Sequence, residues 1–280
     1  MSDADDPEDR GVQQILSHFL SAWNLVADGR PVTTPSSVLL PVLRDGAPAM
    51  LKIATHGEEK RGAALMVWCG GDGAARVLAH DGPALLMERA EDGPSLLPSR
   101  GHTDDEAIEI MCAVIARPHR PRPAPRPALV PLSRWFRNLL CERVTGCPVV
   151  ALAAETARDL LSVRSESTVL HGDIHHGNVL HFGRRGWLAI DPKGLIGHRA
   201  FDYANMFCNP DHEIVTDAER FRRRLEIVSR AADLEKPVLL KWILAWAGLS
   251  ATWMIESDLS PKTPLAVAEL AADALIRAPH

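Results

Sequence analysis

Three side chains that could take part in chemistry lie within one stretch of the sequence, residues 169–192. Asp173 comes two positions after His171, and Asn178 comes five positions after Asp173. Asp191 follows the apolar run W-L-A-I. An H-x-D-x-x-x-x-N spacing followed by a second Asp is the arrangement of a kinase catalytic loop and the metal-binding Asp beyond it.

Each of these residue types suits one requirement of phosphoryl transfer from ATP. A carboxylate must orient the attacking hydroxyl and accept its proton, so Asp173 is the candidate catalytic base. Mg²⁺ must neutralise the phosphates and prefers oxygen ligands, so Asn178 and Asp191 are the candidate metal ligands. Short apolar runs on either side of the turn at 183–186 predict a β-hairpin that would place these two ligands side by side.

A lysine in an apolar strand pattern is the next chemical candidate. Lys52 lies within A-M-L-K-I-A, where burial of an unpaired ammonium group would be costly. A kinase needs a lysine here to hold the ATP phosphates, and it pairs that lysine with a Glu on the next helix. The helical phase after the strand favours Glu59 as this partner. A surface lysine at a strand end is the alternative.

The same stretches resemble a known family. H-G-D-I-H-H-G-N and A-I-D-P-K-G-L-I-G resemble the aminoglycoside phosphotransferase family. The D-P-x-G segment followed by F-D-Y-A-N-M-F is similar to its streptomycin 6-phosphotransferase and hydroxyurea phosphotransferase branch. The resemblance runs from about Val38 to the last helix and is sharpest between residues 169 and 210. It implies a kinase that uses ATP and Mg²⁺ to phosphorylate a small hydroxylated molecule.

The expected fold class is α+β, with a protein-kinase-like fold of two lobes. We expect a disordered acidic tail at 1–10, a small antiparallel-sheet N-lobe at 11–90 that binds nucleotide, and a larger, mainly helical C-lobe at 91–280 that carries the catalytic loop, metal and acceptor sites. Apolar periodicity predicts the individual elements. The strands are expected at 38–42, 49–53, 74–79 and 84–87, and the helices at 12–26, 59–68, 104–116, 132–141, 149–161, 221–232, 239–255 and 262–277.

Further nucleotide contacts follow from position and resemblance. The sequence lacks the Gly-rich loop of protein kinases, and the resembling branch has a Ser-Ser pair in its place. Ser36 and Ser37 are therefore candidate phosphate donors, although an ordinary polar turn is equally compatible with them. The hinge between the lobes should follow the last strand of the N-lobe, where backbone groups near Glu88 and Ala90 would bind the adenine edge.

The sequence identifies the acceptor site less clearly than the nucleotide and metal sites. Trp253, Glu256 and Asp258 lie on or just after the last long apolar helix, which walls the acceptor pocket in the resembling family. Asp202 is a further candidate, although a structural role in tying the catalytic loop fits it better. Acidic side chains would suit a cationic, streptomycin-like acceptor, whereas hydroxyurea would need a tight pocket. Another metabolite as acceptor is a further alternative.

Composition limits the partners. The net charge of −5 argues against general nucleic-acid binding, which needs a basic surface. Five cysteines without a C-x-x-C pair are typical of a reduced, cytoplasmic protein. The apolar run at 238–255 is interrupted by small polar residues, which favours a buried helix over a membrane span. We expect a monomer or weak dimer.

Two other functions are compatible with parts of the sequence. His171, Asp173, His175 and His176 form a dense cluster that could hold Zn²⁺ or Mn²⁺ in a metallohydrolase. A nucleotide-binding pseudokinase is the other, although all of the Lys, Asp, Asn and Asp positions are present. The Pro- and Arg-rich segment 117–127 is interpreted as an exposed connector, and the arginines at 222–224 as a solvated helix face.

Overall fold

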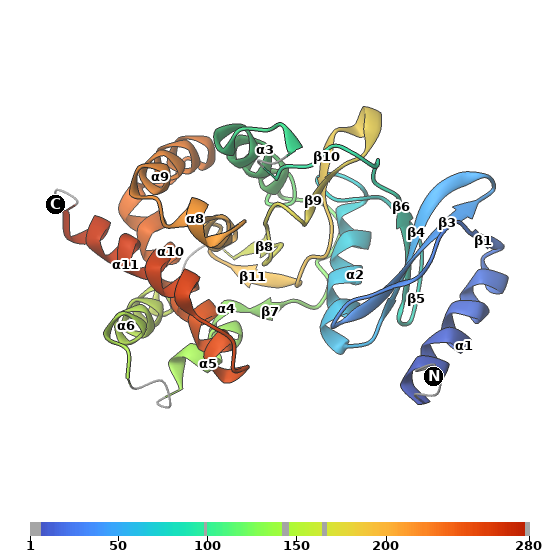
Figure 1. Cartoon of the computed structure of the whole chain (residues 1–280), viewed down its shortest axis with the longest axis horizontal. Coiled ribbons are helices and arrows are strands. Elements are labelled where there is room, and N and C mark those ends of the chain that lie inside the picture. The colour runs from blue at the N-terminus through green and yellow to red at the C-terminus, as the bar shows by residue number, and fades with distance from the viewer. Residues whose placement is uncertain (1–6, 98–99, 142–145, 164–166, 278–280) are drawn as a thin grey trace.

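The computed structural model describes residues 7–97, 100–141, 146–163 and 167–277. A lobe built around an antiparallel sheet holds the N-terminal part of the chain, and a helical lobe holds the C-terminal part (Figure 1). The predicted fold class, protein-kinase-like α+β with a small sheet lobe and a larger helical lobe, is confirmed.

The sheet of the N-lobe is covered on both faces, which explains why its central strands are apolar on both sides. One face packs against α1 (Pro7–Ala22), and the other packs against α2 (Gly57–Cys69). Its strand order is β1-β3-β4-β6-β5, and the short strand β2 also pairs with β3. The strands are β1 (Leu25–Ala27), β2 (Val32–Thr33), β3 (Ser37–Arg44), β4 (Ala47–Ala54), β5 (Val77–Asp81) and β6 (Ala84–Glu88).

Three predictions for the N-lobe need correction. The helix expected over 12–26 ends at Ala22, because Asn24 takes a positive φ of 52° and the next residues pair with β3. The strand expected from Ala74 begins at Val77, since the preceding alanines contact the C-lobe instead. Of the predicted acidic tail, residues 1–6 lie outside the described residues, and residues 7–10 belong to α1.

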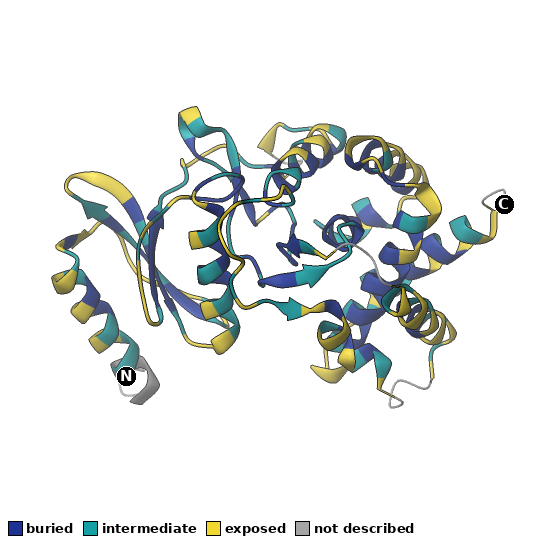
Figure 2. Ribbon diagram, turned by 180° about the vertical axis from the view of Figure 1, so that it is seen from behind, coloured by how far each residue is buried: buried dark blue, intermediate teal, exposed yellow. Residues whose placement is uncertain are grey.

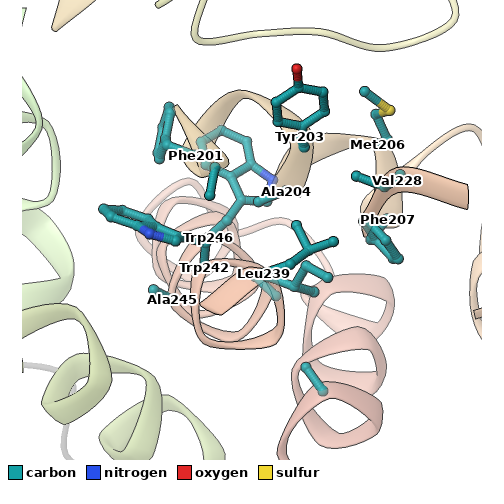
Figure 3. Close-up of a cluster of buried hydrophobic side chains, with 14 of the residues drawn as sticks. Phe201, Tyr203, Ala204, Met206, Phe207, Val228, Leu239, Trp242, Ala245 and Trp246 are labelled. Carbon is teal, nitrogen blue, oxygen red and sulfur yellow. The ribbon is translucent and has the colours of Figure 1, made fainter. Parts of the chain in front are cut away.

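The C-lobe is organised around one long helix, α10 (Lys236–Glu256). Its indole and aliphatic side chains meet the aromatic residues that follow the catalytic loop (Figure 3). Figure 2 shows the surrounding helices burying the sides that face the interior and exposing their outer sides. The other helices are α3 (Asp104–Ala116), α4 (Leu132–Trp135), α5 (Arg137–Leu140), α6 (Pro148–Ser162), α7 (Ala200–Ala204), α8 (His212–Val215), α9 (Ala218–Ala232) and α11 (Lys262–Arg277).

Helix α10 carries three tryptophans at helical spacing. Trp242 and Trp246 are buried, and Trp253 is partly buried. Within the described residues, α10 is the one helix whose length and hydropathy would allow it to cross a membrane, but 67% of its most apolar window is buried inside the fold. The prediction of a buried helix is confirmed.

Three predictions for the C-lobe are wrong in part. The helix expected over 132–141 is two short helices, because Phe136 leaves the helical conformation between them. The connector 117–127 is not wholly exposed: the Arg122 guanidinium binds Asp72 and lies 5.1 Å from the Trp68 ring centroid. Arg224 is buried rather than solvated, because it pairs with Asp104 on α3.

Candidate active site

The candidate catalytic and metal-binding residues lie next to short strands at the junction of the lobes. The stretch from His171 to Asn178 joins β8 (Thr168–Leu170) to β9 (Val179–His181). The predicted hairpin is confirmed, since β9 pairs antiparallel with β10 (Trp187–Ala189). Asp191 follows it with a positive φ of 57°, and Ile190 N–H donates to the Asn178 carbonyl at 2.9 Å.

Asp202 fixes the start of the catalytic loop. Its carboxylate is buried and accepts hydrogen bonds from the backbone N–H groups of His171 (2.9 Å) and Gly172 (2.7 Å). It also lies 2.8 Å from His119 Nε2. All of these contacts lie within the protein, which favours the structural interpretation of Asp202 over the substrate-contact interpretation.

His171 joins the catalytic loop to the segment that carries Asp191. Its Nε2 lies 2.8 Å from the carbonyl oxygen of Ile190, and its Nδ1 accepts from the backbone N–H of Asp173 at 3.2 Å. These two contacts require the neutral tautomer protonated at Nε2. Burial lowers the pKa of His171, against the opposing charges of nearby carboxylates, so the ring stays neutral at physiological pH.

The Asp173 carboxylate is held by amide groups on both sides. Asn178 Nδ2 lies 2.9 Å from the Asp173 carbonyl oxygen and 3.3 Å from Oδ2. Asn205 Nδ2 donates to Oδ1 at 3.0 Å, and Lys193 Nζ lies 3.5 Å from Oδ2. The sequence analysis missed Asn205 and Lys193. Asn205 could have been found from its position three residues after Asp202, which places both on one helical face.

Lys52 forms ion pairs with both Glu59 and Asp191, which confirms the predicted pairing with Glu59. The side chains of Lys52 and Glu59 are only 5% and 8% exposed, whereas that of Asp191 is 31% exposed. The ammonium group therefore links helix α2 of the N-lobe to the residue that follows the hairpin. Two carboxylates offset the cost of burying this charge.

The serine pair is used mostly within the protein. Ser36 Oγ donates to Glu59 Oε1 at 2.8 Å, which supports the carboxylate that pairs with Lys52. Ser37 is buried, and both its hydroxyl and its backbone N–H contact Thr34 Oγ1, at 2.9 and 3.0 Å. The prediction that Ser37 offers these groups to phosphate is therefore wrong.

The donor set around Asn178 and Asp191 fits a hard divalent cation. Because Asn178 Nδ2 is used by Asp173, the amide oxygen of Asn178 is the atom left for a metal. The Asp191 carboxylate keeps one oxygen outside its contact with Lys52. One carboxylate and one amide oxygen are ligands that Mg²⁺ accepts, with waters and phosphates completing its octahedron.

A cavity of about 600 Å³ lies at the expected hinge. Part of its wall is apolar and includes Met50, Met87, Leu180 and Ile190, while charged residues such as Glu91 border the rest. Glu88 N–H donates to the Arg76 carbonyl at 3.0 Å, so this N–H is not available to a ligand.

Ala90 also lines the hinge cavity. Its N–H and carbonyl have no backbone partner within the described segments. The cavity therefore combines an apolar slot with unpaired backbone groups at one end, an arrangement that suits a planar heteroaromatic ring.

The acceptor candidates on and after α10 lie in different surroundings. Trp253 lines a second cavity of about 610 Å³. Glu256 accepts from Asn138 Nδ2 at 2.6 Å, next to that cavity. Asp258 is exposed and is not among the described residues that line it.

The histidine cluster does not form a metal centre. Both nitrogens of His171 are used inside the protein, and His175 Nδ1 accepts from Gly177 N–H. His176 is buried elsewhere, and burial is the main cause that lowers its pKa to about 4. In the described parts of the chain no group of three or more His, Cys, Asp or Glu side chains could hold a metal ion. The metallohydrolase alternative is therefore not supported.

Comparison with known proteins agrees with this geometry. A profile of the family described as Aminoglycoside/hydroxyurea antibiotic resistance kinase matches residues 22–258. A streptomycin 3''-kinase of Klebsiella pneumoniae is 45% identical over 264 residues, which cover 92% of this chain and 98% of the relative. A streptomycin 6-kinase of Streptomyces griseus is 33% identical, over 94% of this chain and 90% of its own length.

Solved structures show the same fold. A thermostable mutant of the aminoglycoside phosphotransferase APH(4)-Ia, in a ternary complex with AMP-PNP and hygromycin B, superposes with a TM-score of 0.63. The match covers 92% of this chain and 98% of that one, at 11% sequence identity. Identity this low supports the fold alone.

Proposed function

Because the chain belongs to the aminoglycoside/hydroxyurea antibiotic resistance kinase family, we propose that it transfers the γ-phosphoryl group of ATP to a hydroxyl of a streptomycin-like aminoglycoside. Membership makes the chain a small-molecule phosphotransferase with an alcohol group as acceptor. The observation that carries the finer proposal is the Asp173 carboxylate, held by Asn178 and Asn205 beside the Lys52–Asp191 ion pair.

The nucleotide would lie between the lobes. Adenine would enter the apolar cavity at the hinge, with its polar edge against the backbone of Ala90 and the carbonyl of Glu88. Lys52 would hold the α- and β-phosphates. Glu59 would position Lys52, and Ser36 supports Glu59 by a hydrogen bond. Asn178 and Asp191 would ligate Mg²⁺, and the metal, when bound, neutralises charge that develops on the phosphates.

Asp173 would act on the acceptor. Its carboxylate accepts the proton of the attacking hydroxyl as that oxygen bonds to the γ-phosphorus, while the bond to the bridging oxygen of ADP breaks. The Lys193 ammonium lies 3.5 Å from this carboxylate. Burial alone would lower the pKa of Lys193, but Asp173 and three other carboxylates raise it, so the group stays cationic beside the transferring phosphoryl.

Among possible hydroxyls we favour the 3'' position of streptomycin. The 3''-kinase relative is 45% identical and is covered over 98% of its length, compared with 33% and 90% for the 6-kinase. We place the reaction in the cytoplasm, in keeping with five cysteines that are all free.

An ATP-consumption assay with Mg²⁺ against streptomycin, other aminoglycosides and hydroxyurea tests the proposal. We expect turnover of streptomycin, with NMR locating the phosphate at the 3''-hydroxyl. Asp173→Asn should lower kcat on the order of 10²–10⁴-fold, the range for general-base catalysis, while ATP binding measured by calorimetry stays within about twofold. Asp81→Asn, which alters an exposed carboxylate at the end of β5, is the matched control. Near-normal turnover by Asp173→Asn would contradict its role as the base.

A further inference from the structure

A second cavity lies between the lobes and shares no lining residue with the hinge cavity. It encloses about 610 Å³, a volume within the usual range for small-molecule sites. Glu58 and Arg61 reach it from α2 in the N-lobe, and Trp135 and Trp253 reach it from the C-lobe. A ligand here would contact both lobes at once.

Three buried polar atoms in the lining of this cavity lack a hydrogen-bond partner among the described residues. They are Glu58 Oε1, Arg61 Nε and Trp135 Nε1, and they make up three of the seven such side-chain atoms. Leaving buried polar groups unpaired destabilises a protein. Their gathering among the lining residues of one cavity indicates a site that a ligand completes, because hydroxyl groups can donate to Glu58 and accept from Arg61 and Trp135.

Contacts connect this cavity to the catalytic base. The Trp253 and Trp246 ring centroids are 5.7 Å apart, and Trp246 Nε1–H donates to Asn205 Oδ1 at 3.1 Å. The other end of the Asn205 amide donates to Asp173 at 3.0 Å. Trp246 and Asn205 therefore link the lining residue Trp253 to the catalytic base by direct side-chain contacts.

The charges of the lining indicate which chemistry it accepts. Arg61, Arg134 and Arg137 border the cavity, and none of them forms an ion pair within the described part of the chain. Glu58 is the carboxylate among the described lining residues. Such a lining disfavours a ligand portion that carries several cationic groups, and it leaves a place for one cation at most, beside Glu58.

The aromatic side chains of the lining indicate a further property of the ligand. Trp135 and Trp253 pack edge to face, with centroids 5.5 Å apart and an interplanar angle of 82°. Their indoles offer apolar area to the C–H face of a ring, while arginine and carboxylate groups pair with its hydroxyls. Hydroxyurea, with five heavy atoms, would leave most of 610 Å³ unfilled.

We propose that this cavity is the acceptor-recognition site and that it takes a polyhydroxylated ring carrying no more than one cation, read by Glu58, Arg61 and Trp135. The inference rests on the proposed function and deepens it: two residues of the N-lobe helix α2 would select the acceptor. The more highly charged part of an aminoglycoside would then lie outside the cavity.

Binding of streptomycin to the catalytically inactive Asp173→Asn protein, measured by calorimetry, tests this without turnover. Adding Trp135→Phe, which removes the N–H and keeps an aromatic ring, should weaken binding roughly 3–10-fold. Adding Glu58→Gln should weaken it about 10–100-fold, because a charge-assisted hydrogen bond is lost. Trp187→Phe on β10, remote from the cavity, is the matched control and should change binding less than twofold.

The alternatives give separate results. In the active enzyme the same cavity variants should raise the KM for streptomycin and leave the KM for ATP unchanged. If they leave streptomycin binding intact while Asp173→Asn still abolishes turnover, the cavity assignment is overturned and the kinase function stands. If inorganic phosphate binds and Arg61→Met abolishes that binding, the cavity is an anion site and the inference is overturned. If streptomycin neither binds nor reacts, both proposals fail.

Discussion

The orientation of one amide group decides how the catalytic carboxylate is held. Asn205 Oδ1 accepts hydrogen bonds from Trp246 Nε1 and Asn209 Nδ2, at 3.1 and 3.0 Å. An indole N–H can only donate, so the oxygen of Asn205 must face Trp246. Its nitrogen must then face Asp173 and donate to it. Asn205 is buried, so solvent cannot replace this contact easily.

We predict that Asn205 acts as a positioning residue for Asp173. Asn205→Ala should lower kcat about 10–100-fold, because the carboxylate loses a donor that orients it, while the KM values for ATP and acceptor stay within about threefold. Trp246→Phe removes one of the two donors to Oδ1 and keeps the ring, so a smaller loss in kcat is expected. Steady-state kinetics of both variants check this. Equal changes in kcat and both KM values would instead indicate a general structural defect.

Residue-scale prediction from the sequence succeeded where a motif fixes the geometry. Lys52 was identified because an ammonium in an apolar strand needs a partner. Glu59, on the helix that follows this strand, is that partner. Asn205 and Lys193 were missed because their contacts with Asp173 arise from tertiary packing. Ser37 was misassigned because the hydrogen bonds that occupy it form within its own turn.

At the scale of elements, a buried ion pair joins helix α3 to helix α9. Arg224 on α9 contacts Asp104 at the start of α3, and these side chains are 1% and 7% exposed. The guanidinium also donates to the carbonyls of Met206 and Asn209, each at 2.7 Å. It therefore ties both helices to the segment that follows Asn205.

We predict that Arg224→Met destabilises the protein by about 3–5 kcal/mol, because it leaves Asp104 and two carbonyls buried without a partner. Arg223→Met is the matched control, since that side chain is 68% exposed in its pair with Asp105, and exposed pairs contribute about 0–1 kcal/mol. Urea unfolding at pH 7 measures both. A loss below about 1 kcal/mol for Arg224→Met would contradict the role of the pair.

The same pair has a pH dependence with a defined sign. Burial would raise the pKa of Asp104, but the hydrogen bond and charge of Arg224 lower it overall. A carboxyl with a lowered folded pKa contributes stability above its unfolded pKa of about 3.9, and that stability is lost as pH falls further. In Arg224→Met the same burial, no longer opposed by the guanidinium, raises the pKa of Asp104. The stability gap between wild type and Arg224→Met should therefore be largest near pH 7, begin to narrow as Asp104 of the variant takes up a proton, and narrow further below about pH 4.

Element-scale prediction was reliable for long periodic helices and poor for short or tertiary-determined segments. The spacing over 104–116 predicted α3 with its observed bounds, because a capping box of Thr103 and Glu106, which is local in sequence, fixes the start of this helix. The breaks at Asn24 and Phe136 depend on contacts with distant strands and helices. Local sequence carries little information about such breaks.

At the scale of the whole molecule, the lobes meet where α2 approaches the loop after Asp191. A Cβ on Gly62 would lie 2.1 Å from the carbonyl oxygen of Pro192, and one on Gly194 would lie 3.3 Å from the Arg61 backbone. Glu59 on the same helix pairs with Lys52, which also pairs with Asp191. The close packing of glycine against backbone therefore sets the distance between the nucleotide-holding helix and the metal-binding residue.

We predict that Gly62→Ala disables the enzyme without unfolding it. A methyl group there must push α2 away from the loop of Asp191, so kcat should fall and the KM for ATP should rise, together about 10–100-fold in kcat/KM. Overpacking against the backbone costs about 1–3 kcal/mol, and the higher helix propensity of alanine offsets about 1 kcal/mol of this, so thermal unfolding should show a modest loss of stability with the protein still folded. Gly57→Ala, at the start of the same helix with nothing within 4 Å of its Cβ, is the matched control and should keep near-normal kinetics. Normal ATP kinetics in Gly62→Ala would show that the lobes tolerate a wider separation at this contact.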